Sequence, residues 1–392
     1  MPRSLTALVG AQVCLHACMT GTRMAAPLLA LRLGYSTFAV GVLIALFALA
    51  PMLLALPAGR LADRAGYHRP VRIGVGMSLA GAGLATAWPH YVTLALAATL
   101  TGAGTSVAMV AMQRTAGRSA RASTELKRVF SWLALAPAAS NVIGPVVAGA
   151  LIDTLGFRAA FAAMALLPLL ALHWSRLVPP EAPRTNVATG SATQATLELL
   201  RRPALRRLLV VNGILSACWD VHTFTVPVLG HERGLSASAI GLVLGSFSAA
   251  ATAVRLVIPA LAERLREVQV LSGAMVATAV LFAIYPFTAA AWQMAACSAL
   301  LGLALGSVQP MVMSTLHLIT PPEHHGKAIA LRMMTINFSS TTMPLLFGAA
   351  GAAFGAGPLF WGLGLVVLVG ARTAHGLVDA LSEPAKSDAP VG

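Results

Sequence analysis

The sequence has few charged residues and few aromatic ones. Aspartate, glutamate, lysine and arginine together make up 10% of its 392 residues, and aromatic residues make up 6%. Apolar residues make up 57%, which is more apolar surface than soluble domains of this length could bury. The composition therefore excludes a soluble globular protein and predicts an integral membrane protein surrounded by a lipid bilayer.

Acidic residues are scarcer than basic ones, with 13 against 27, so the net charge is +14. Nucleic-acid binding is one explanation of such an excess, but the positions of the charges argue against it. With a cytoplasmic N-terminus, only Arg32, Arg158 and Arg233 face outward, Arg23 and Arg255 lie within spans, and the other basic residues lie in or beside cytoplasmic segments. This distribution follows the positive-inside rule, so it predicts that both termini are cytoplasmic and that no nucleic acid is bound.

Cysteine is rare, and no catalytic or metal-binding pattern accompanies it. Cys14, Cys18, Cys218 and Cys297 all fall within apolar stretches, and their spacing suggests no pair and no redox motif. Neither a nucleophile with its base nor a cofactor-binding loop is visible, so we expect no cofactor, no metal and no enzymatic activity. Arginine outnumbers lysine by 24 to three, which suggests a bacterial genome and hence the bacterial inner membrane.

Long apolar runs are abundant. A helix needs roughly 20 apolar residues to cross ~30 Å of hydrocarbon, and stretches of this kind recur twelve times. They lie at 5–32, 37–59, 71–88, 91–113, 129–152, 157–177, 208–229, 238–262, 268–287, 291–317, 328–353 and 357–379. The sequence thus predicts an all-α integral membrane protein with twelve transmembrane helices.

The two halves of the chain repeat each other. Residues 15–64 return at 215–264 with identities such as Gly34/Gly234, Ser36/Ser236 and Gly41/Gly241, and an offset of 199 relates Pro145/Pro344 and Gly149/Gly348. A repeat of this length indicates one structural unit built twice. We expect two pseudo-symmetric six-helix bundles, at 1–177 and 208–380, joined by a polar cytoplasmic linker at 178–207 and followed by a tail at 381–392.

A glycine- and arginine-rich loop follows the second predicted helix. Together with the six-plus-six repeat, the stretch from Gly59 to Arg69 resembles the loop signature of the major facilitator superfamily. The signature residues are Gly59, Asp63, Arg64, Gly66 and Arg69. The resemblance implies that Asp63 meets the start of the eleventh helix near 327–330, and Arg114 or Arg118, when the transporter faces outward. A carboxylate gains there from the helix dipole and the free amides.

A weaker copy of this loop occurs in the second half. Glu263 and Arg264 keep the acid and the arginine, while the glycines are lost. Arg255, one or two turns earlier, matches a residue common in the eighth helix of this family. The resemblance assigns these three residues to gating structure.

The fifth predicted helix carries a glycine-proline pattern. Gly144, Pro145 and Gly149 resemble the signature of the drug and metabolite:proton antiporter branch, although Ser140 and Ala148 replace two of its small residues. Small residues permit close helix packing, and proline permits a bend, so plain packing is an alternative reading. The arginine that many such exporters carry in the middle of the fourth helix is missing.

Polar stripes mark a substrate cavity. Four polar residues share one face of the first helix and four take the same places in the seventh: Gln12, His16, Thr20 and Arg23, then Asn212, Ser216, Asp220 and Thr223. Such stripes are costly in lipid unless they face water or polar partners. Other expected wall residues come from the fourth, tenth and eleventh helices: Ser106, Met109, Gln113, Gln309, Met313 and Asn337.

Asp220 is the one acid deep within a predicted span, and Arg23 lies at a matching depth. We expect an Arg23–Asp220 ion pair across the cavity, and proton exchange on Asp220 as the contact changes, with His16 as a second titratable group. A static polar clamp is the alternative.

The resulting hypothesis is a monomeric secondary transporter that exports a drug or metabolite in exchange for protons. Its partners would be a small-molecule substrate and the proton. Proton-coupled uptake of an organic anion is the competing hypothesis, because Arg23 would suit a carboxylate.

Overall fold

Twelve long α-helices make up nearly all of the fold. The computed structural model describes residues 3–119, 123–180, 201–261, 266–320 and 325–382, and these contain no strand. The helices are α1 (Arg3–Arg32), α2 (Thr37–Ala65), α3 (His68–Ala87), α4 (Tyr91–Ser119), α5 (Ser123–Leu155), α6 (Phe157–Ser175), α8 (Pro203–Glu232), α9 (Ala237–Leu261), α10 (Glu267–Ile284), α11 (Ala291–Ile319), α12 (His325–Phe354) and α13 (Ala356–Ser382). Each coincides with one predicted span, so the twelve-helix prediction is confirmed.

Most of these helices are apolar enough to cross a bilayer. Within the described residues, nine satisfy length and composition, and α13 contributes a shorter apolar segment at Ala356–Ala371. The apolar sequence of α12 is interrupted by Arg332, Asn337 and a run of serines and threonines, although the helix is continuous. A transmembrane helix tolerates such polar residues, which lower its mean hydropathy, on a face that packs against other helices rather than lipid.

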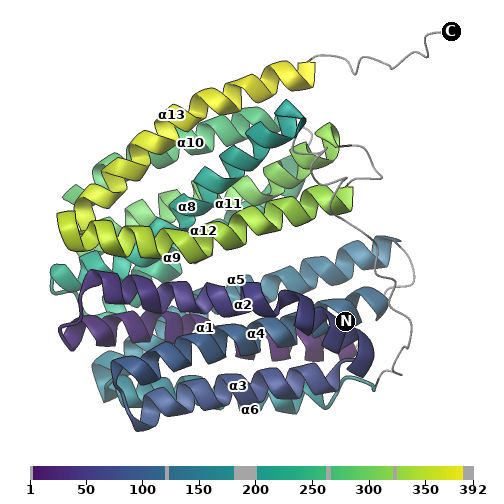
Figure 1. Ribbon diagram of the computed structural model, residues 1–392, viewed down its shortest axis with the longest axis vertical. Coiled ribbons are helices and arrows are strands. Elements are labelled where there is room, and N and C mark those ends of the chain that lie inside the picture. The colour runs from purple at the N-terminus through teal and green to yellow at the C-terminus, as the bar shows by residue number, and fades with distance from the viewer. Residues whose placement is uncertain (1–2, 120–122, 181–200, 262–265, 321–324, 383–392) are drawn as a thin grey trace.

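The helices form two bundles, α1–α6 and α8–α13, which lie one above the other in Figure 1. The pattern of burial along residues 11–30 of α1 recurs position by position along residues 211–230 of α8. Both helices therefore occupy equivalent places, and the predicted pseudo-symmetry extends from sequence to packing.

Because the helices alternate in direction, the bundles have two distinct ends. We call the end that carries the N-terminus and the Gly66 turn the terminal face. We call the opposite end, with the turns at Gly34, Gly156, Gly234 and Gly355, the distal face. The terminal face lies on the right of Figure 1 and the distal face on the left.

The repeated residues build equivalent distal turns. Gly34 and Gly234 have φ values of 81° and 67°, a region in which a Cβ atom is disfavoured. Ser36 and Ser236 then cap the next helices, because each hydroxyl accepts a hydrogen bond from the amide three residues later, at 3.3 Å and 3.1 Å. These identities thus preserve local geometry at the distal face.

The two bundles cross closely at two pseudo-equivalent places. Gly241 of α9 lies against Pro145 of α5, where an added Cβ atom would come within 2.5 Å of the proline carbonyl oxygen. On the other side, Gly41 of α2 contacts Pro344 of α12 in the same manner, and a Cβ atom on Gly348 would lie 3.1 Å from the Cα atom of Gly41. The glycine and proline identities of the repeat therefore meet each other across the two halves.

The apolar core joins the halves only toward the distal face, as far as the described residues extend. One cluster combines the distal portions of α1, α2 and α5, including Leu28, Ile44 and Ile152, with much of the second bundle. The terminal portion of the first bundle has a separate cluster, which includes Leu8, Val71 and Met112. The halves are thus closed together at the distal face.

Alanine at Gly41 or Gly241 should destabilise this closure. The added methyl group meets backbone atoms of the other bundle, so the helices must separate, at a cost of about 1–3 kcal/mol. We expect a lower midpoint of thermal unfolding for each variant. Gly76→Ala is the matched control, since a Cβ atom added there would meet nothing within 4 Å. An unchanged midpoint in Gly241→Ala would contradict the crossing.

Candidate functional site

A polar cavity of about 500 Å³ lies between the two bundles. Side chains from seven helices line it: α1, α4, α5, α8, α9, α11 and α12. It reaches toward the terminal face, where Gln113 is exposed and Arg332 lies two turns from the start of α12. The conformation is therefore closed at the distal face and accessible from the terminal face.

The structure brings eight of the fourteen expected substrate-site residues into this cavity: Gln12, His16, Arg23, Gln113, Asn212, Ser216, Asp220 and Gln309. Thr20 and Thr223 line a smaller cavity of about 60 Å³ on its distal side, which Arg23 also borders. The remaining four are not among the residues that line either cavity: Ser106, Met109, Met313 and Asn337. Helical spacing predicts which residues share a face of one helix, but it did not show whether that face lines the cavity.

Asp220 is 4% exposed and receives hydrogen bonds from α12. The Ser339 hydroxyl donates to its Oδ2 atom at 2.8 Å, and the Ser340 hydroxyl donates to Oδ1 at 3.1 Å. Each hydroxyl offsets part of the cost of burying a carboxylate. Asp220 therefore has its partners within its own bundle.

The expected Arg23–Asp220 ion pair does not form in this conformation. Both side chains belong to the described part of the chain and border the same cavity, where their charges interact at a distance, but no direct salt bridge joins them. Among the described residues, the buried Nε atom of Arg23 has no hydrogen-bond partner, and the same holds for the Nδ1 atom of His16 and the Oε1 atom of Gln12. Because the cavity separates the two bundles here, α1 presents a stripe of unsatisfied polar groups to it.

The cavity residues that sequence reasoning missed include Asn141, Trp219 and Arg332. The Nε atom of Arg332 donates to the Oδ1 atom of Asn212 at 3.2 Å, while its Nη2 atom is buried without a partner among the residues described. Positions 133, 137 and 141 of α5 and positions 332, 336 and 340 of α12 all line the cavity. The 199-residue offset relates these sets, so extending the repeat comparison would have found Arg332.

Arg255, expected to belong to a gate, also borders the cavity. Its Nε atom donates to the carbonyl oxygen of Gly306 at 3.2 Å, and its guanidinium lies 5.6 Å from the ring centroid of Trp219. Both contacts favour a cation in this position. Arg255 therefore belongs to the wall of the candidate site.

The other gating candidates lie near the terminal face. Gly59, Arg64, Gly66, Arg69 and Arg114 are on or next to α2, α3 and α4, and Gly66 ends α2 with a φ of 67°. Glu263 and Arg264 lie outside the described residues, and so do the side chains of Asp63 and Arg118. The predicted contact of Asp63 with α12 stays a prediction.

The antiporter-like motif lies at the crossing of α5 and α9. Pro145 packs against Gly241, Gly149 packs against the Ala237 carbonyl, and Gly144 packs against Thr20 and Gly21 of α1. The Thr20 hydroxyl donates to the Ser140 carbonyl oxygen at 2.9 Å. The motif thus provides the close contacts of α5 with one helix of each bundle.

The carboxylate of Asp153 joins α5 to α9 at the distal face, and we call this contact the Asp153 latch. Asp153, near the end of α5, accepts hydrogen bonds from the backbone amides of Ala237 at 3.0 Å and Ser238 at 2.7 Å. These are the first two amides of α9, so the helix dipole adds to the interaction. The 199-residue offset places Ala352 at the matching position, so the latch occurs at one of the two crossings.

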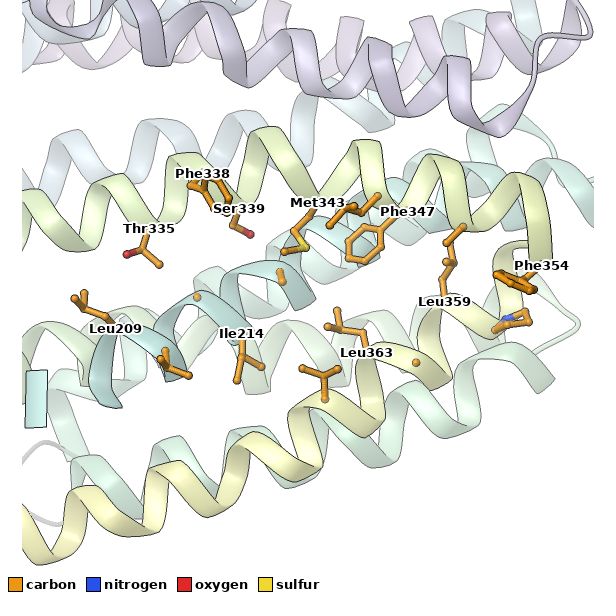
Figure 2. Close-up of a pocket in the computed structure, with 18 of the residues that line it drawn as sticks. Leu209, Ile214, Thr335, Phe338, Ser339, Met343, Phe347, Phe354, Leu359 and Leu363 are labelled. Carbon is orange, nitrogen blue, oxygen red and sulfur yellow. The ribbon is translucent and has the colours of Figure 1, made fainter. Parts of the chain in front are cut away.

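A larger cavity than the polar one is an apolar groove of about 920 Å³ between α8, α12 and α13. Figure 2 shows Leu209 and Ile214 of α8, Phe347 of α12 and Leu363 of α13 around it. Ser339 also borders it, but its hydroxyl is committed to Asp220. Since a binding site needs polar groups that orient its ligand, the polar cavity is the candidate functional site.

Comparison with known proteins identifies the family. Residues 8–233 and 208–378 match the Major Facilitator Superfamily, and the chain belongs to it. It is therefore a multi-pass membrane transporter rather than an enzyme, and the sequence-based prediction of the family is confirmed.

Individual relatives are more distant. The efflux pump azaK of Aspergillus niger is 29% identical over 348 residues, which cover 79% of this chain and 72% of that protein. A POT family transporter solved with 5-aminolevulinic acid has a TM-score of 0.80 at 12% identity, covering 98% of this chain and 97% of the other. A mutant of the nucleoside transporter NupG has a TM-score of 0.74 at 13% identity, with 95% and 99% covered. The solved structures show a shared fold.

Removing the Asp153 carboxylate should loosen the distal face. Asp153→Ala deletes both bonds to α9, and an N-terminal helix cap of this kind contributes about 1 kcal/mol. Spin labels at the exposed positions Leu155 and Glu232 should report a larger population with a wide separation of the two bundles. Thr154→Ala is the control, because the Thr154 hydroxyl bonds within α5. Identical distance distributions in Asp153→Ala and the control would contradict the latch.

Proposed function

We propose that this protein moves a small organic molecule across the membrane by alternating access, coupled to a proton that binds Asp220. The main support is that one buried carboxylate, Asp220, and an arginine without a salt bridge, Arg23, border the same cavity between the two bundles. Substrate sites in transporters built from repeats lie near the membrane midplane between the repeats. The position of the polar cavity between the two bundles supports the proposal.

The conformational cycle is a rocking of the two bundles about their glycine crossings. In the state described, the distal face is held by the α5–α9 and α2–α12 contacts and by the Asp153 latch. In the opposite state these contacts would open, and Asp63 would engage the start of α12 at the terminal face. Two packed arrangements of rigid bundles are the usual basis of such switching.

Proton exchange follows from the surroundings of Asp220. Serine hydroxyls of α12 stabilise its carboxylate in one state, and approach of Arg23 would stabilise it further when the bundles rock together. Movement away from these partners favours protonation, because an unpaired charge is costly in a buried site. Conformation and proton occupancy are thereby linked, with His16 as a second group beside the cavity.

Export is the direction that the efflux pump relative supports, together with the antiporter-like Gly144, Pro145 and Gly149 at the α5–α9 crossing. Exchange of a drug or metabolite for protons is therefore the first candidate. Uptake of an organic anion is the second candidate, because three arginines and one carboxylate are among the described residues that line the cavity.

The charge distribution supports an orientation with both termini in the cytoplasm. The terminal face is then cytoplasmic, and residues 178–207 link the two bundles on that side. We place the protein in a bacterial inner membrane and treat it as a monomer, since one chain supplies both halves of the cavity.

Asp220→Asn should abolish coupling while the protein still folds, because asparagine keeps hydrogen-bonding capacity toward Ser339 and Ser340 but cannot exchange a proton. We expect purified protein in liposomes to lose substrate movement driven by an imposed pH gradient. Exchange of substrate between two equal pools should persist, since it needs no net proton transfer.

Glu232→Gln is the matched control for this test, because it removes a carboxylate from the exposed distal end of the same helix. Gradient-driven transport should be unchanged in that variant. Retention of gradient-driven transport by Asp220→Asn would exclude Asp220 as the coupling group and favour a static polar clamp.

A further inference from the structure

The charges around the polar cavity do not balance. Arg23, Arg255 and Arg332 line it, whereas Asp220 is the one acidic residue among the described residues of its lining. Asp220 is already held by two serines of its own bundle. A positive excess in a partly dehydrated site is costly unless an anion offsets it.

The three arginines differ in how well they are satisfied. Arg255 has the Gly306 carbonyl and the face of Trp219, and Arg332 has the Asn212 amide oxygen. Within the part of the chain that the structure describes, Arg23 has no hydrogen bond from its buried Nε atom and no salt bridge. Of these three, it is also the one that borders both the main cavity and its small distal extension. Arg23 and Arg332 thus each leave one buried nitrogen without an acceptor, and Arg23 is the one of the two that lies deeper in the site.

We propose that the substrate is an organic anion whose carboxylate or other acidic group binds Arg23, with its apolar body between Trp219, Leu305 and Ile336. The guanidinium fork suits two-point binding of a carboxylate. The three apolar side chains line the same cavity and suit a hydrocarbon or aromatic portion. This inference rests on the proposed transport function, because it takes the cavity as the substrate site. It favours the second candidate, an organic anion, over exchange of a drug or metabolite for protons.

An anion at Arg23 would share its surroundings with Asp220. Other charged or titratable groups near that carboxylate come from three neighbouring helices and from α8 itself: His16, Arg255, Arg332, Cys218 and His222. The buried Nε2 atom of His222 is engaged with Ser298, and Cys218 is fully buried. α11 contributes the uncharged Gln309 to the cavity. Asp220 is therefore the carboxylate that a bound anion would repel.

This repulsion sets the sign of the coupling. A proton on Asp220 removes the like charge and leaves Arg23 to the substrate, so proton and anion favour each other's binding. Linkage is reciprocal, so the bound anion favours protonation to the same extent. Anion and proton would then cross together, in a direction set by the sum of their gradients: an acid accumulated inside would leave with a proton, and an inward proton gradient would drive uptake.

The test uses three probes of one shape: 1-naphthoate, its neutral amide and the cation 1-naphthylmethylammonium. Isothermal titration calorimetry on the purified full-length protein measures the dissociation constant of each. We expect naphthoate to bind about tenfold more tightly than the amide, with the cation weakest. Arg23→Gln should remove the preference for naphthoate, Arg23→Lys should keep part of it, and Arg158→Gln, at an exposed distal position, should change nothing.

The pH dependence tests the linkage. Naphthoate stays ionised between about pH 6 and pH 8, so a change in affinity reports on the protein. We expect binding about tenfold tighter at the lower pH in the wild type. Asp220→Asn should bind tightly at both values. A pH dependence that survives in Asp220→Asn and disappears in His16→Gln would overturn the role of Asp220.

Equal affinities for the three probes, a preference for the cation or no binding of naphthoate would overturn the anion assignment. Thermal unfolding of Arg23→Lys and Arg23→Gln confirms that each variant is folded. Binding as expected without movement into liposomes would refute the transport function and leave the anion site standing. Transport of a neutral or cationic compound without naphthoate binding would refute the anion inference alone.

Discussion

The close approach of helix backbones at the distal face is the constraint on which the cavity depends. Gly41 and Gly241 bring α2 against α12 and α5 against α9, and a Cβ atom at either position would hold the bundles apart. The apolar core is continuous between the bundles on this side. Because contact is concentrated there, the polar stripes of α1 and α8 face each other across an open space instead of packing together.

The internal repeat divides into two kinds of position. Those that are identical, such as Ser36/Ser236 and Gly41/Gly241, make turns, caps and crossings, which both halves need equally. Those that differ carry the charges: in the repeat, Arg23 corresponds to Thr223, Asp220 to Thr20, and Arg332 to Leu133. Asp153 follows the same rule, since Ala352 takes its place in the second half. In the proposed cycle, the pseudo-symmetric frame would provide two states, and the asymmetric charges would give those states different affinities for protons and anions.

The polarity of the two cavities indicates which of them is the better candidate for the substrate site. The apolar groove beside α13 is larger, but apart from Arg206, Thr335, Ser339 and backbone atoms its described lining is apolar. The polar cavity has an unsatisfied arginine and a buried carboxylate that is held from one bundle only. The proposed rocking would change the distance between α1 and α8, so both groups would change their electrostatic surroundings with conformation, as coupled transport requires.

The sequence by itself determined the membrane location, the twelve helices, their pairing into equivalent halves and eight of the twenty residues that line the polar cavity. Apolar runs, the repeat and helical spacing are local or periodic signals in the sequence. The features that they predict are set by hydrophobic burial and backbone hydrogen bonding alone. Tertiary structure decided which polar faces meet. It left Arg23 and Asp220 without a direct salt bridge, gave Asp220 hydrogen bonds from Ser339 and Ser340, left Met109 and Met313 out of the cavity lining and brought Arg332 into it. These outcomes depend on how far apart the bundles lie and on helix rotation within each bundle, which long-range packing sets and spacing along one helix does not encode.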